Sequence, residues 1–138
     1  MTSRRGGIKA PIPSRRKGHT MTKRAYAIAY LREVDFGDAI IEYLQRIDET
    51  LAPYGGHFIV HGGEITATEG EWDGDIVIIA FPDAAAAKAW YESPAYQAIL
   101  PLRTEHSQSI ACLVEGVTPG HRAVDKLAAL LGTAAGQD

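Results

Sequence analysis

The segment at residues 54–103 constrains the fold more than any other part of the chain. Two apolar stretches with strand-like alternation, residues 57–65 and 75–81, are separated by glycines and an extended arm, and a helix-forming stretch follows them. Ser93 and Pro94 restart that helix, because serine caps a helix and proline suits its first position. This segment therefore predicts two consecutive strands followed by a helix.

Four local signals add detail to this segment. Gly62-Gly63 predicts a bulge or a close backbone approach in the first strand, and Asp73-Gly74 predicts a tight hairpin turn before the second. Asp83 is predicted to cap the start of the helix. Pro101 is predicted to bend or end its second part.

The flanking sequence completes a pattern of six elements. Residues 24–33 alternate as a strand does, and residues 36–52 carry apolar side chains at helical spacing up to Pro53. Residues 109–116 form the last predicted strand. The order strand–helix–strand–strand–helix–strand, with two right-handed crossovers, predicts an α+β fold. We expect a ferredoxin-like plait, in which both helices cover one face of a four-stranded antiparallel sheet.

The second face of this sheet predicts a partner. The strands at 24–33, 75–81 and 109–116 carry apolar residues on both faces. An antiparallel sheet with one face in water needs alternating polar residues there, and these are scarce here. A second layer must therefore cover that face. The chain itself offers at most a helix predicted at 119–131, so we expect a symmetric homodimer whose two sheets face one another.

The first twenty residues differ in composition from the rest. Residues 1–20 contain six basic and no acidic residues and few large apolar side chains, so we expect a disordered basic extension. We expect the folded domain over residues 21–118, and a C-terminal helix with a frayed tail over residues 119–138. The whole chain has a net charge of −3, so the domain is acidic and a poor partner for nucleic acid.

The cysteine count, the apolar runs and the motifs limit the expected location and cofactors of the protein. Cys112 is the only cysteine, which excludes an intrachain disulfide and favours a reducing, cytoplasmic location. No apolar run approaches the ~20 residues of a membrane-spanning helix, so we expect no membrane partner. The sequence contains no phosphate-binding loop, dinucleotide-binding fingerprint or nucleophile elbow. We therefore expect no cofactor, with a haem on one axial histidine as a remaining alternative.

His57 and His61 are the candidate catalytic residues. On a helix their four-residue spacing can bind a metal, but on a strand it separates them by ~13 Å, too far for one ion. We therefore predict no metal site. Strand alternation places both histidines on one face together with Ile59. There, either histidine could act as a general base near neutral pH. The alternative is a hydrogen-bonded or interfacial role.

Four further residues are candidate ligand contacts. Tyr26 and Tyr30 share one face of the first strand and would orient a substrate, and Trp72 would close the mouth of a pocket. Arg103 would hold a ligand carboxylate with two parallel hydrogen bonds. The alternatives are core or interface packing for the aromatic rings, and an ion pair with Glu105 or another acid for the arginine. Together these residues predict a small-molecule site, either between the helices and the sheet or within a barrel made by the dimer.

Several stretches of the chain resemble a bacterial family of short proteins, the domain-of-unknown-function family number 1330. The stretches read YGGHFIVHGG, EGEW, IIAFPDAAAAKAWYESPAYQ, PLR and LVEGV, and the resemblance spans residues 23–117. It implies membership of the dimeric α/β-barrel group, in agreement with the predicted topology. That group includes cofactor-independent monooxygenases, muconolactone isomerase-like enzymes, haem-handling proteins and ligand-sensing domains.

Two functional hypotheses follow. The first is a cofactor-independent enzyme that transfers a proton or oxygenates a small, partly aromatic organic acid, with His57 or His61 as the base. The second is a non-catalytic ligand-binding or stress-associated dimer. A catalytic histidine should lie in a concave, partly apolar pocket within reach of a hydrogen-bond partner. The position of the two histidines therefore separates the hypotheses.

Overall fold

The computed structural model describes residues 23–136. The predicted basic extension at residues 1–20 lies outside this range. One compact unit spans Lys23–Gly116, and a separate part from Val117 onward contains helix α5 (Ala123–Gly136). The C-terminal helix that the sequence predicts is thus present, with its start at Ala123. Within the described range, no helix combines the length and the apolar character needed to span a membrane.

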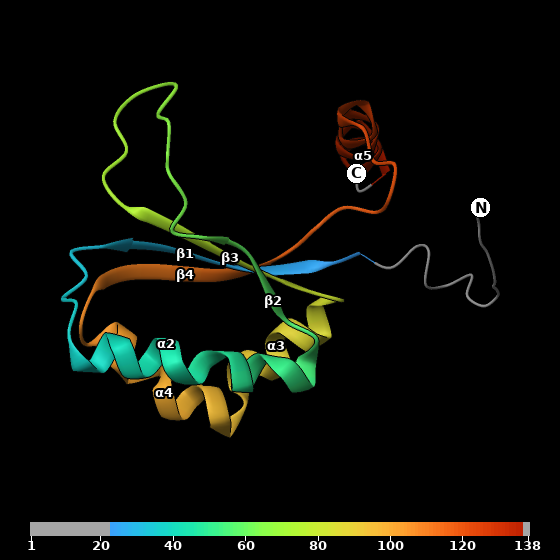
Figure 1. The fold of residues 1–138 in the computed structure, drawn as a ribbon. Helices are drawn as coiled ribbons and strands as arrows, with labels where there is room; N and C mark the ends of the chain where they lie inside the picture. Colours follow the sequence, from blue (N-terminus) through green and yellow to red (C-terminus); the bar gives the residue numbers. More distant parts are fainter. Residues whose placement is uncertain (1–22, 137–138) are drawn as a thin grey trace, which may run out of the picture. The chain divides into compact units, whose positions relative to one another are not determined.

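A four-stranded antiparallel sheet forms the centre of the Lys23–Gly116 unit, with the strand order β2-β3-β1-β4. Helices α2, α3 and α4 lie along one face of this sheet (Figure 1). The arrangement confirms the predicted ferredoxin-like α+β fold, and the sheet of one chain stays open rather than closing into a barrel. The elements are β1 (Ala25–Arg32), α2 (Asp38–Leu51), a short 3-10 helix η1 (Ala52–Tyr54), β2 (His57–His61), β3 (Asp75–Phe81), α3 (Ala84–Glu92), α4 (Pro94–Thr104) and β4 (Gln108–Glu115).

The second crossover has the predicted helix caps. The Asp83 carboxylate accepts a hydrogen bond from the backbone nitrogen of Ala86 at 2.8 Å, which caps α3. The Ser93 hydroxyl oxygen accepts one from the backbone nitrogen of Tyr96 at 3.2 Å, and Pro94 takes the first position of α4. Both caps satisfy backbone N–H groups that a helix start leaves unpaired.

The strand β2 is shorter than predicted. It ends at His61, because Gly62 adopts a φ of 70°, which side chains other than glycine rarely allow. Residues 62–74, here called the arm, leave the sheet on the side opposite to α2 and α4 (Figure 1). The arm returns tightly onto β1, since a Cβ on Gly74 would lie 2.7 Å from the carbonyl oxygen of Leu31. A glycine is needed there for close approach, not for the tight hairpin that the sequence predicts.

The two faces of the sheet have different coverings. The face that carries Ala27 and Ala29 packs toward the helices and is called the helix face. The other face, called the open face, is not covered by any helix of the Lys23–Gly116 unit, and the arm touches it at Tyr30 (Figure 1). It is apolar, as predicted, and Ile110 on it is 72% exposed. From the strand register, its side chains are Tyr26, Ile28, Tyr30, His57, Val60, Ile76, Ile78, Ala80, Ile110, Cys112 and Val114.

The hydrophobic core lies between the helix face and the helices. Phe81, Tyr96 and Ile99 are its largest fully buried side chains. The indole nitrogen of Trp90 donates a hydrogen bond to the Thr50 hydroxyl at 2.9 Å, which joins α3 to α2 across the core. The aromatic residues of the second crossover are therefore held rigidly, and they form one wall of the site described next.

Candidate functional site

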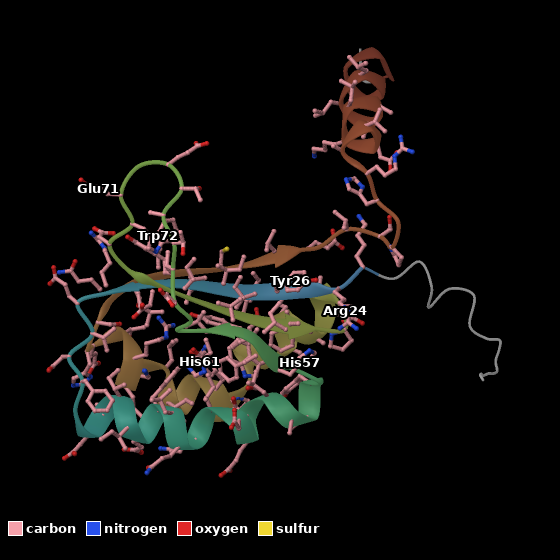
Figure 2. All side chains as sticks on the ribbon, turned by 45° about the horizontal axis from the view of Figure 1, so that its top comes forward. Arg24, Tyr26, His57, His61, Glu71 and Trp72 are labelled. Carbon is pink, nitrogen blue, oxygen red and sulfur yellow. The ribbon has the colours of Figure 1, made fainter. Side chains whose placement is uncertain are left out.

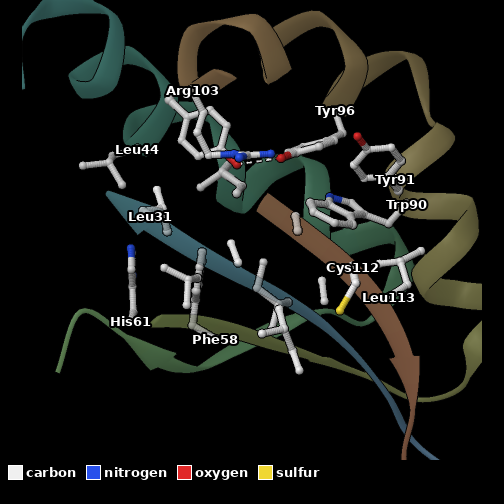
Figure 3. Close-up of a pocket in the computed structure, with 18 of the residues that line it drawn as sticks. Leu31, Leu44, Phe58, His61, Trp90, Tyr91, Tyr96, Arg103, Cys112 and Leu113 are labelled. Atoms are coloured by element: carbon white, nitrogen blue, oxygen red, sulfur yellow. Dashed lines mark hydrogen bonds between the residues drawn. The ribbon is translucent and has the colours of Figure 1, made fainter. Parts of the chain in front are cut away.

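A cavity of about 360 Å³ lies between the helix face and the helices (Figure 3). Pockets of ~300–1,000 Å³ with mostly apolar walls are typical of small-molecule sites. Protein interiors otherwise contain few voids larger than a water molecule. The size of this cavity therefore points to a ligand rather than to imperfect packing.

Small side chains on the sheet make room for the cavity. Ala29 of β1 pairs directly with Ala111 of β4, and Ala27 lies on the same face two residues earlier. On the opposite side stand Trp90 and Tyr96, whose rings are 4.1 Å apart between centroids. Three alanines thus leave a low, flat floor where a close-packed core would carry larger side chains.

Arg103 is a buried cation on the cavity wall. It lies in the last turn of α4, because this helix continues past Pro101 instead of bending or ending there as the sequence predicts. Its side chain is 7% exposed, and Nη1 donates a hydrogen bond to the Ser109 hydroxyl at 2.7 Å. No ion pair joins it to a described carboxylate, including Glu105. A buried charge without a counter-charge is costly, so this guanidinium is suited to receive an anion.

Tyr43 and Tyr96 place two buried hydroxyl groups beside the guanidinium. Their oxygens are 2.7 Å apart and share a hydrogen bond. Figure 3 shows the side chains of Tyr96 and Arg103 pointing toward one another. Burial, and secondly the Tyr96 hydroxyl, raise the pKa of Tyr43 well above its usual value, although Arg103 opposes the shift. Tyr43 is therefore a neutral phenol, able to donate a hydrogen bond, at neutral pH.

The charge of Arg103 is also fixed by these neighbours. Burial alone would lower the pKa of Arg103, but the Tyr96 and Tyr43 hydroxyls raise it on balance. The side chain therefore stays a cation. The bond between the two tyrosines uses one of their two hydroxyl protons, and no described side chain accepts the other. The site thus offers guanidinium N–H groups and one phenol proton to an incoming acceptor.

His61 lines the cavity, whereas His57 does not. A register shift between Phe58 and Val60 puts an extra residue into β2, so the strand alternation reverses before His61. His61 consequently shares the helix face with Phe58 and stacks on it, with 4.3 Å between ring centroids and 10° between planes. His57 lies on the open face. The prediction that both histidines share one face is therefore wrong, and the predicted bulge lies in mid-strand rather than at the glycine pair.

The other predicted ligand contacts lie outside the cavity. Tyr26 and Tyr30 point to the open face, and Trp72 stands on the arm (Figure 2). The Trp72 ring meets the Tyr30 ring edge-on, with centroids 5.3 Å apart, and the Tyr30 hydroxyl donates to the Asp73 carboxylate. Arg32 lies 3.6 Å from the same carboxylate. These contacts fix the arm to the sheet, and they leave Arg103 and His61 as the two predicted residues that share the cavity.

The tyrosine pair and the alanine floor are not among the sequence-based predictions. Nothing local to Tyr43 or Tyr96 indicates that their hydroxyls meet. The floor had a visible signal in the alternation of alanine along β1, since alanine at every second position of a strand leaves one face low. Among the described residues, no group of three or more His, Cys, Asp or Glu side chains is placed to hold a metal ion.

The sequence of residues 24–117 matches the family model described as "Domain of unknown function (DUF1330)". The chain belongs to this family. The match covers all four strands and the three helices that enclose the cavity of this DUF1330 domain. No curated protein matches the chain.

Solved structures share the fold of the DUF1330 domain. A dimeric ferredoxin-like protein of unknown function from Jannaschia sp. CCS1 is similar, with a TM-score of 0.53 and 17% identity over 67% of this chain and 98% of that chain. A methylated protein of unknown function from Rhodopseudomonas palustris has a TM-score of 0.51 and 18% identity over 72% of this chain and 85% of that one. Both likenesses establish the fold alone.

Proposed function

We propose that this protein binds a small organic acid in the cavity, with the ligand carboxylate on Arg103. The single observation that carries the proposal is a buried guanidinium, without a carboxylate partner among the described residues, on the wall of an apolar cavity of about 360 Å³. The Tyr43–Tyr96 pair supplies the second donor. A bound anion would remove the cost of the lone buried charge.

The charge balance favours a carboxylate over other anions. One guanidinium neutralises one negative charge, and its planar fork matches the two oxygens of a carboxylate. A phosphate monoester would leave a second negative charge in an otherwise apolar cavity, at a cost of several kcal/mol. The rest of the wall offers apolar contact, so the remainder of the ligand is a hydrocarbon or aromatic body.

Calorimetric titration with a series of monocarboxylic acids, from octanoate to 2-naphthoate, and with the matched alcohols tests this proposal. We expect acids to bind and alcohols to bind far more weakly. Arg103→Met, which keeps the length of the side chain, should weaken acid binding at least about 100-fold, and Arg103→Lys should lie in between. Arg46→Met, which removes an exposed arginine of α2, is the control. Equal affinity for acids and alcohols would contradict the proposal.

The position of His61 supports a catalytic version of the same site. Its ring lines the cavity that holds Arg103, and imidazole is the side chain best suited to take a proton near neutral pH. In such a step His61 takes a proton from the carbon beside a ligand carbonyl group. A C–H bond breaks, an N–H bond forms, and the electron pair moves to the carbonyl oxygen. The tyrosine proton or Arg103 would stabilise that oxygen.

Phenylpyruvate is a suitable probe, because it carries a carboxylate, an aromatic ring and an acidic methylene group. Exchange of its methylene protons in D2O is followed by NMR. A catalytic site should speed the exchange over buffer, and His61→Gln should remove the increase while binding persists. His57→Gln, on the open face, should keep it. If exchange is no faster than in buffer, the result favours the alternative hypothesis of a non-catalytic binding protein.

The apolar open face supports a homodimer as the functional state. Nine of its side chains are aliphatic, aromatic, alanine or cysteine on β1, β3 and β4, and Ile110 and Val114 are 72% and 44% exposed. Contiguous apolar patches of this kind mark interfaces in soluble proteins. The similar protein from Jannaschia sp. CCS1 is described as dimeric. A second copy of the chain that meets this face with its own is the proposed partner, by two-fold symmetry.

A further inference from the structure

We propose that the ligand of the cavity is a planar aromatic carboxylic acid, whose ring system slides between an alanine floor and an aromatic roof. The inference rests on the proposed organic-acid site and specifies its substrate class. It comes from the shape of the cavity walls, which Arg103 does not determine.

The floor of the cavity is flat because of its residues. Ala27, Ala29 and Ala111 present single methyl groups at neighbouring positions of β1 and β4. A methyl group rises little above the pleated backbone, so the three together form a low surface. Larger side chains on this face, such as Ile79, are packed into the core and bound the low area instead of filling it.

The roof is aromatic and rigid. Trp90, Tyr91 and Tyr96 contact one another, with ring centroids 4.1 Å apart for Trp90 and Tyr96 and 5.6 Å apart for Tyr91 and Tyr96. The indole nitrogen of Trp90 is held by the Thr50 hydroxyl at 2.9 Å. In Figure 3 these rings stand across the cavity from the strands, on the same side as Arg103. A rigid roof cannot adapt to a thick ligand, and aromatic rings prefer to contact other aromatic rings.

The arrangement therefore selects on thickness and on aromatic character together. A flat ring can contact the floor with one side and the roof with the other while its carboxylate reaches the guanidinium. A puckered saturated ring of the same outline is thicker and has no π-system. The selection is independent of charge, because both ligands carry the same carboxylate.

The test compares three ligands of one outline on the full chain by calorimetry: 2-naphthoate, its saturated analogue decahydro-2-naphthoate, and 2-naphthalenemethanol. We expect naphthoate to bind roughly tenfold or more tightly than the saturated acid. The neutral alcohol should bind most weakly. In a Trp72→Phe protein, the single remaining indole N–H signal, from Trp90, should shift in NMR spectra when naphthoate is added.

The outcomes separate this inference from the proposed function. Equal affinity for the two acids, both lost in Arg103→Met, would overturn the planar class and leave the organic-acid site standing. Binding of octanoate but of neither bicyclic acid would overturn the planar class alone, and binding of none of the three would overturn both. A naphthoate that binds without moving the Trp90 signal would place the ligand elsewhere and would also overturn the inference.

Discussion

The two faces of the sheet are both apolar, but they differ in the size and exposure of their side chains and suit different proposed partners. The helix face carries alanines at 27, 29 and 111 under a cavity, with one buried cation at its edge. The open face carries large aliphatic and aromatic side chains, and several of them are exposed. Small residues under a rigid roof leave room for a molecule. Large residues on an open surface leave area for a protein.

The placement of charge sharpens the contrast. Arg103, on the cavity wall, is buried and has no carboxylate partner among the described residues. Arg32, at the end of β1, pairs with Asp73 of the arm in a half-exposed position. Exposed ion pairs contribute little to stability, and a lone buried charge costs much. The difference supports the proposal that Arg103 receives a ligand anion, whereas Arg32 and Asp73 hold the arm against β1.

The largest expected effect is on the open face. Ile110→Asp puts a charge on the proposed interface, at the edge strand β4, and burying it there costs several kcal/mol. The dimer dissociation constant should rise at least about 100-fold. Phe36→Asp is the matched control, because Phe36 is 70% exposed, close to the 72% of Ile110, and lies on the loop before α2. Sedimentation velocity at micromolar concentration measures the change.

Two results would contradict the proposed dimer interface on the open face. If wild-type protein sediments as a monomer, the open face has no second copy of the chain on it. If Phe36→Asp dissociates the dimer and Ile110→Asp does not, the interface lies at the other side of the molecule.

A smaller effect is expected when the helix-face cavity is filled. Ala29→Leu adds three carbon atoms to the floor and should weaken binding of 2-naphthoate by ~30-fold or more. The free energy of unfolding should stay equal to wild type or rise by about 1 kcal/mol, because filling a cavity adds contacts. Ala85→Leu, on an exposed position of α3, is the control. Calorimetry and urea unfolding measure the two quantities. Unchanged binding in Ala29→Leu would show that the ligand does not use the floor.

The smallest effect concerns the hydroxyl pair. The pKa of Tyr43 is raised in the folded state, mainly by burial, whereas the unfolded chain releases this proton near pH ~10. Above that pH the unfolded state binds fewer protons than the folded state, so stability falls as pH rises. The slope is ~1.4 kcal/mol per pH unit for one proton. Urea unfolding at pH 9 to 11.5 should show a shallower slope in Tyr43→Phe, and identical slopes would contradict the burial of the phenol.

Local patterns predicted much of the fold. The order of strands and helices along the chain, the helix caps at Asp83 and Ser93 and the strands with two apolar faces all follow from periodicities and residue preferences that act within a few residues. The register of β2 does not follow from such local patterns. The extra residue between Phe58 and Val60 is set by pairing with β3, and one such residue turns His61 to the opposite face from His57.

The candidate site was predictable only in part, because its geometry depends on contacts between residues far apart in the sequence. Arg103 is a predicted carboxylate ligand, but its burial and its lack of an ion pair with a described carboxylate depend on how α4 packs in the fold, mainly against α2. The meeting of Tyr43 and Tyr96 joins residues 53 positions apart. Contacts of this range are fixed by the tertiary fold, which sequence periodicity does not specify.

The crystal structure of the protein with 2-naphthoate tests the central claim most directly, that Arg103 is the receptor of a ligand carboxylate. The account predicts the two carboxylate oxygens within ~2.7–2.9 Å of guanidinium nitrogens, with the ring system over Ala29. An occupied cavity in which the carboxylate points away from Arg103, or a naphthoate found only on the protein surface, would contradict it.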